Sequence, residues 1–148
     1  MRRWLAALLL LLSPTLFAQE LYMVRSRLSF PEAMTVLQEA IREQGYRISR
    51  VQRVDIGLTT FGYKTDKYRV VFFGTLDELR MISDRYPDLV PYFPTKIAIF
   101  AEGDETILLA ASFAHLRPFF KEAELQRHFD HWEADIRAIL ERVRTAEQ

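Results

Sequence analysis

The chain contains no cysteine, which excludes disulfide bridges and thiol catalysis. It also has no excess of one charge, since 20 basic and 20 acidic residues leave a formal net charge of zero. A chain without a basic surplus has no global electrostatic reason to bind nucleic acid, so we expect no nucleic-acid partner.

Motifs typical of enzymes are missing as well. The sequence has no phosphate loop, no dinucleotide fingerprint and no Gly-x-Ser-x-Gly elbow around Ser112. No two carboxylates stand at a defined spacing that would predict glycosidase chemistry. We therefore expect no cofactor and favour a domain without catalytic activity.

The N-terminal apolar run is too short to span a bilayer, because a spanning helix needs roughly 20 residues. Two arginines precede the run 4–12, and Ala18 is followed by a polar pair. This order is typical of a secretory signal peptide that is cleaved after Ala18. We expect residues 1–18 to be removed and residues 19–148 to form one periplasmic or secreted domain with no membrane attachment. A retained anchor is the alternative.

Hydrophobic spacing predicts alternating strands and helices along this domain. The expected strands are 21–28, 46–55 with a bulge, 67–73, and a hairpin of 97–101 and 106–113. Gly57 and Gly62 bracket a short strand or loop. Because the strand 67–73 is apolar on both sides, we expect it to be central and covered on both faces.

Two capping boxes predict where helices begin. Ser29 precedes Glu32 before the predicted helix 30–44, and Thr75 precedes Glu78 before a helix that ends at Pro87.

The C-terminal helix, about 121–144, has an apolar stripe at helical spacing. Its members are Leu125, Phe129, Trp132, Ile136, Ile139 and Val143. This stripe must lie either against the sheet or against a second copy of the chain, which would make it a dimer seam.

Several runs occur in the order of a known family. Val70–Gly74 precedes a helix, Tyr86-Pro87 follows it, and Tyr92–Glu102 comes next; upstream lie Ser29–Ala33 and Gly45-Tyr46. Over roughly residues 22–143 the chain resembles the family called domain of unknown function 302. The resemblance implies an α+β fold of the β-α-β(n)-α helix-grip (TATA-binding-protein-like) type. It would have a curved antiparallel sheet and a long C-terminal helix.

The resemblance also implies export in many members and a possible homodimer, but no established activity. Family members often follow Phe-Gly with Asn-Pro and then a small Gly-Thr pair. Here Thr75-Leu76 follow Gly74, and Leu79-Arg80 replace the small pair. A ligand-binding loop at this place would be lost or changed, so no binding residue is carried over.

Histidines on the last helix form the sharpest polar cluster. His128, His131 and Asp135 share one side of the helix, and these are ligand types that zinc accepts. The alternative is a solvated helix shoulder beside Phe129 and Trp132. His115, which follows the last strand, is a lone candidate acid or base without a neighbouring nucleophile in the sequence.

Aromatic residues make up 13% of the chain, which is more than a minimal core needs. They indicate either a tightly packed core or an apolar cavity for a small hydrophobic ligand. The leading hypothesis is a periplasmic, non-catalytic domain that binds a small ligand or a periplasmic protein partner. The alternative is a metal-binding protein or metal-dependent enzyme that uses the histidines of the C-terminal helix.

Overall fold

The computed structural model describes residues 21–147, so the predicted signal peptide, residues 1–18, lies outside the described residues. Five strands form one antiparallel sheet in the order β1-β5-β4-β3-β2. The elements are β1 (Leu21–Ser26), α2 (Phe30–Glu43), β2 (Arg47–Arg53), α3 (Val54–Thr59), β3 (Tyr68–Gly74), α4 (Leu76–Arg85), the 3-10 helix η1 (Pro87–Tyr92), β4 (Thr95–Glu102), β5 (Glu105–Ala111) and α5 (Ala123–Thr145). None of the helices in this part is long and apolar enough to cross a membrane. The expected α+β fold with a long C-terminal helix is confirmed.

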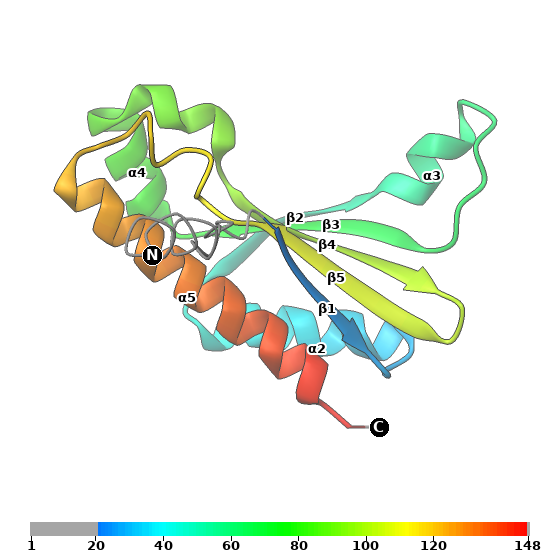
Figure 1. Ribbon diagram of the computed structural model, residues 1–148. Helices are drawn as coiled ribbons and strands as arrows, with labels where there is room; N and C mark the ends of the chain where they lie inside the picture. Colours follow the sequence, from blue (N-terminus) through cyan, green and yellow to red (C-terminus); the bar gives the residue numbers. More distant parts are fainter. Residues whose placement is uncertain (1–20, 148) are drawn as a thin grey trace, which may run out of the picture.

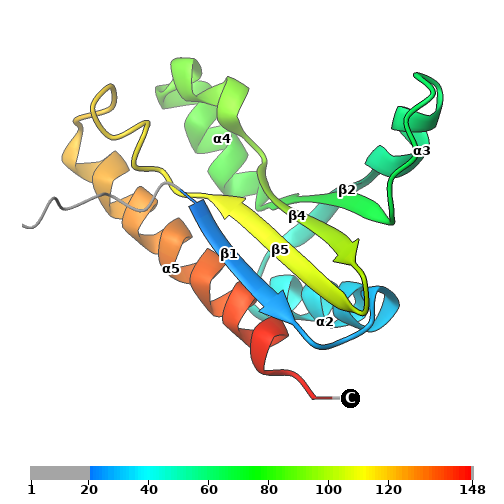
Figure 2. The same ribbon diagram turned by 45° about the vertical axis from the view of Figure 1, so that its right-hand side comes forward.

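Helices α2 and α5 lie side by side along one face of the sheet (Figures 1 and 2). The whole predicted stripe of α5 is buried there, from Leu125 to Val143. A subunit seam on this stripe is therefore the wrong alternative, because the stripe is already covered within one chain.

Both predicted capping boxes form at the helix N-termini, and a glycine ends the first helix. The Glu78 N–H donates to Thr75 Oγ1 at 3.2 Å, and the Thr75 N–H donates to Glu78 Oε2 at 3.1 Å. At the first helix the Ser29 N–H donates to Glu32 Oε2 at 3.0 Å. Gly45 ends that helix with a φ of 85°, a left-handed conformation that glycine adopts without a steric penalty.

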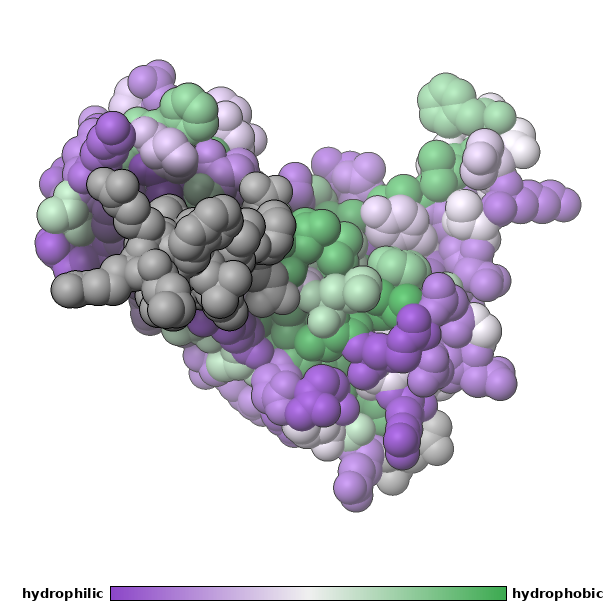
Figure 3. All heavy atoms as spheres, in the orientation of Figure 1, coloured by the Kyte–Doolittle hydropathy of each residue, from purple (hydrophilic) through white to green (hydrophobic). Residues whose placement is uncertain are grey.

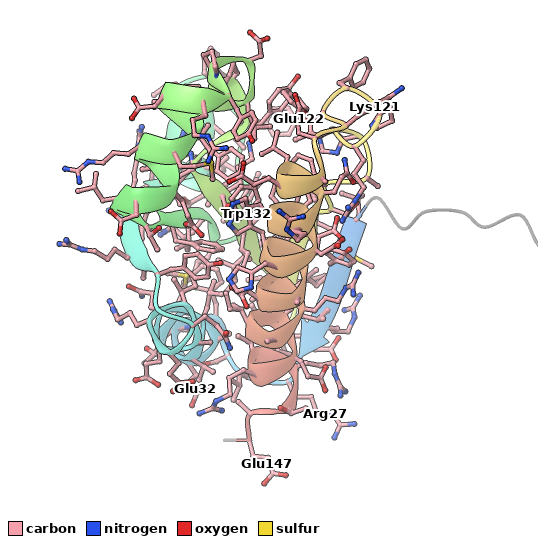
Figure 4. The ribbon with its side chains drawn as sticks, turned by 90° about the vertical axis from the view of Figure 1, so that its left-hand side faces the viewer. Arg27, Glu32, Lys121, Glu122, Trp132 and Glu147 are labelled. Carbon is pink, nitrogen blue, oxygen red and sulfur yellow. The ribbon has the colours of Figure 1, made fainter. Side chains whose placement is uncertain are left out.

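Aromatic side chains fill the space between α5 and the end of the sheet. The ring centroids of Phe93 and Trp132 are 4.8 Å apart, and those of Phe113 and Phe129 are 5.1 Å apart. The Trp132 indole N–H donates to Glu78 Oε1 at 2.8 Å, which joins α5 to α4 (Figure 4). On this side of the sheet, the packed core rather than the apolar cavity accounts for these aromatic residues.

Two expectations are wrong. The predicted strand 46–55 ends at Arg53, and the segment expected as a strand or loop between Gly57 and Gly62 begins inside a helix, α3, which spans residues 54–59. Strand β3 is covered by helices on one face only: Val71 and Phe73 are buried, whereas Val70 is only partly buried on the opposite face. The bulge predicted within the strand 46–55 is confirmed, because the register of β2 shifts between Ile48 and Arg50.

We expect Phe129→Ala to lower the free energy of unfolding by about 3–5 kcal/mol, because it opens a cavity in this core. Phe129 is 0% exposed, whereas Phe119 is 80% exposed. Phe119→Ala is therefore the matched control and should change stability by less than about 0.5 kcal/mol. Urea unfolding followed by circular dichroism measures both; equal effects would contradict the described core.

Candidate binding face of the sheet

The side of the sheet opposite α2 and α5, called the open face here, carries ordered rows of side chains. Residues directly paired in an antiparallel sheet point to the same face. The pairing therefore aligns a middle row across all five strands, flanked by one row on each side. The middle row is Gln52, Val70, Ala98, Leu109 and Met23; the flanking rows are Arg50, Phe72 and Lys96 on one side, and Tyr68, Phe100, Ile107 and Arg25 on the other.

The open face is hollowed at its centre. A cavity of about 370 Å³ lies over the strands, and most of its lining is apolar. Figure 3 shows apolar residues gathered in the depression between two raised parts of the molecule. These parts are α3 on one side and the α4–η1 segment on the other (Figures 1 and 2). The lining side chains come from Leu21, Gln52, Val54, Tyr68, Val70, Phe72, Lys96, Ala98 and Leu109–Ala111.

The two ends of the open face carry opposite charge. At one end lie Arg50 and Lys96, which form no ion pair with any residue in the range 21–147. At the other end Arg25 Nη1 lies 2.6 Å from Glu102 Oε2 and 2.8 Å from Glu105 Oε2. Hydrogen bonds to these two carboxylates raise the pKa of Arg25. One cation between two carboxylates leaves this end with a net negative charge.

Helix α3 follows directly from β2, and among the residues described one ion pair links the wall that it forms to β3. Arg69 on β3 pairs with Asp55 on α3, and both side chains are partly buried. The hydrogen bond from the Arg69 guanidinium lowers the pKa of Asp55. Farther out, Phe61 is 84% exposed and Tyr63 is 68% exposed. The α3 wall thus ends in aromatic side chains that the described part of the chain does not cover.

The structure brings two of the three candidate metal ligands together, His131 and Asp135, and engages the third, His128, elsewhere. The His128 ring stacks on Trp132, with the ring centroids 5.3 Å apart. His131 Nε2 lies 3.3 Å from Asp135 Oδ2, which also accepts a 2.6 Å hydrogen bond from the Tyr46 hydroxyl. No group of three His, Cys, Asp or Glu residues that could hold a metal occurs among the residues described. Metal binding by this set stays a prediction from the sequence, without support from the geometry.

His115 lies at the edge of the open face. It lines a second hollow, of about 170 Å³, together with Tyr92, Ser112 and Lys96. The Ser112 hydroxyl is buried and accepts a 3.2 Å hydrogen bond from the Ala114 N–H; within residues 21–147 it forms no hydrogen bond with His115. Lys96 and Ala111 line both hollows, so the two adjoin each other. Spacing in the sequence does not predict that these side chains line one hollow, because residues 92, 96 and 115 come together only through the fold.

The architecture defines a class of small α+β domain: a five-stranded antiparallel sheet with one helix-covered face and one open face. The family model described as "Domain of unknown function DUF302" matches residues 22–143, and the chain belongs to this family. A crystal structure of an uncharacterized conserved DUF302 protein from Bacillus stearothermophilus has the same fold, with a TM-score of 0.76. It shares 17% sequence identity, over 86% of this chain and 100% of the other. No curated protein matches the chain.

We expect Asp55→Asn to loosen the α3 wall without unfolding the domain. Amide hydrogen exchange across residues 54–67 should speed up at pH 7, while global stability changes by no more than about 1 kcal/mol. Asp66→Asn is the control, because Asp66 is exposed and forms no ion pair in the described part of the chain.

The same ion pair sets the direction of the pH dependence. Because the pKa of Asp55 is lowered, its stabilisation is complete above the ordinary value of about 3.9 and is lost as pH falls through the lower folded value. Protection of 54–67 should therefore decline below about pH 4 in the wild type. An Asp55→Asn protein that declines equally over this range would contradict the assignment to Asp55.

Proposed function

We propose that this chain is an exported, non-catalytic domain that binds a small apolar molecule in the hollow of its open face. The observation that carries the proposal is the middle row, where Val70, Ala98 and Leu109 lie side by side on a face that no helix within residues 21–147 covers. The volume of about 370 Å³ falls within the range of small-molecule sites.

The composition of the hollow supports an apolar ligand. Val70, Phe72 and Leu109 are only partly buried, so they still have apolar surface to give to a ligand. Burial of such surface contributes roughly 25 cal/mol per Å². Two polar side chains of the lining, Gln52 on β2 and Lys96 on β4, can orient a ligand that carries one polar group.

The polar groups of the hollow support binding rather than catalysis. Catalysis of acyl or proton transfer needs a nucleophile or base that is positioned by a partner. Among the lining residues, the titratable side chains are Tyr68 and Lys96, which lie in different rows of the face. Neither has a neighbouring carboxylate or imidazole in this lining.

Binding to the open face can be tested with the neutral fluorophore N-phenyl-1-naphthylamine. We expect its fluorescence to rise with wild-type residues 19–148. Val70→Glu should weaken its binding at least about 10-fold, because a carboxylate would lie against the apolar ligand. Val51→Glu is the matched control: Val51 is on the neighbouring strand, pairs with Val71 and so points to the other face.

Equal binding by the two variants would place the fluorophore elsewhere and contradict the proposal. A different outcome is a wild type that fails to bind the fluorophore but captures one defined periplasmic protein, which the Val70→Glu variant does not capture. That result would contradict the small ligand and indicate a protein partner at the open face.

Export has its own test, because it depends on residues 1–18 alone. The full chain, expressed in a Gram-negative host, should be recovered in the periplasmic fraction with Gln19 as its first residue. Intact-mass spectrometry of that fraction measures this. A cytoplasmic chain that retains residue 18 would contradict export, and a membrane-bound one would indicate the retained anchor.

A further inference from the structure

The second hollow, lined by Lys96, Ser112 and His115, differs from the apolar hollow in size and in chemistry. Its volume of about 170 Å³ lies below the roughly 300–1,000 Å³ that is typical of complete small-molecule sites, whereas the apolar hollow has about 370 Å³. The two hollows adjoin at Lys96 and Ala111. The smaller one therefore suits a single polar group of a ligand whose apolar part lies in the larger one.

The polar side chains of the second hollow can all donate hydrogen bonds. The Lys96 ammonium carries three donors and forms no ion pair with any described residue. The Ser112 hydroxyl accepts a hydrogen bond from the Ala114 N–H, so its own proton can be donated to a ligand. The His115 ring, whose centroid is 6.3 Å from that of Tyr92, has an N–H donor in either protonation state. This set of donors matches an acceptor group.

The charges around the two hollows favour an acceptor group with one negative charge. No Asp or Glu occurs among the described residues that line either hollow, and Lys96 is the one Lys or Arg among them. A lysine ammonium acts as a point charge, whereas the arginine fork matches the geometry of phosphate. At the far end of the open face, Glu102 and Glu105 flank Arg25 and leave a net negative charge. An anionic group is therefore favoured at the Lys96 end.

We infer that the second hollow binds the carboxylate of an apolar monocarboxylic acid, whose hydrocarbon part lies in the apolar hollow. This inference rests on the proposed function and specifies the chemical class of its ligand. The hydrocarbon part runs from Lys96, beside η1, toward α3, where Val54 lines the apolar hollow (Figure 1). Along β3 the lining extends from Phe72 to Tyr68, which is about 13 Å at about 3.3 Å per residue. This length suits a medium-length alkyl chain such as that of decanoate.

Isothermal titration calorimetry of residues 19–148 with decanoate at pH 7 tests the inference. Lys96→Met keeps an apolar stem but removes the ammonium group, and Lys96 is exposed, so the variant should fold. We expect it to bind decanoate at least about 10-fold more weakly than the wild type, because the carboxylate loses a charge-assisted hydrogen bond. Its affinity for the neutral N-phenyl-1-naphthylamine should stay unchanged.

Two further variants separate a local carboxylate site from a general effect of positive charge. Arg50→Met removes another unpaired cation in the same row, but Arg50 lines neither hollow. It lies two strands from Lys96, about 10 Å away, which exceeds the screening length of about 8 Å at physiological ionic strength. This matched control should bind decanoate like the wild type. His115→Phe keeps a ring beside Tyr92 but removes the N–H donor, and it should weaken decanoate binding several-fold.

The outcomes separate this inference from the proposed function. Equal decanoate binding by the wild type and Lys96→Met, or an equal loss in Lys96→Met and Arg50→Met, would overturn the inference. A wild type that binds the fluorophore but not decanoate would also overturn it, and both results would leave the proposed function standing. Tighter binding of decyl phosphate than of decanoate would replace the carboxylate with a phosphate. A wild type that binds none of these probes would overturn both proposals.

Discussion

Coverage of the sheet on one face only is the constraint on which the rest of the structure depends. Strand side chains alternate between the two faces, so a five-stranded sheet presents two surfaces. Helices α2 and α5 cover one of them, where Val71, Ile97 and Leu108 are buried. The other presents Val70, Ala98 and Leu109, which the described chain leaves partly exposed. Since exposed apolar area favours association, the open face is the part of the molecule that a binding function would use.

The covered face makes the open face a rigid platform. The α5 stripe and its aromatic neighbours pack against the helix-covered face of the sheet. The rows on the open face therefore keep their register without a bound ligand. The walls are less constrained, because α3 is joined to β3 through the partly buried pair of Asp55 and Arg69. A rigid sheet beside a wall that one partly buried ion pair holds to β3 suits the binding of a small molecule.

The sequence predicts the parts of this fold that depend on neighbouring residues. Both capping boxes, the hairpin and the α5 stripe follow from spacing and hydrogen-bonding chemistry alone. It also signals the open face, because residues 68–73 are apolar on both sides. The sequence pattern predicts cover on both faces of this strand, but it cannot tell whether a helix of the same chain or a separate molecule provides that cover. The sequence does not predict helix α3, because Gly57 weakens its helical pattern. It also does not predict that His128 stacks on Trp132 instead of joining His131 and Asp135.

Methyl NMR of the three methionines in residues 19–148, recorded with and without N-phenyl-1-naphthylamine, tests the central claim, that the open face binds a ligand, most directly. Met23 on the open face is 65% exposed, whereas Met34 and Met81 are partly buried against the core. With a soluble paramagnetic agent, binding at the open face predicts that the fluorophore weakens the broadening of the Met23 methyl signal and leaves that of Met34 and Met81 unchanged. A Met23 signal that stays equally broadened when the fluorophore is bound would mean that the face is bare, and would contradict the account.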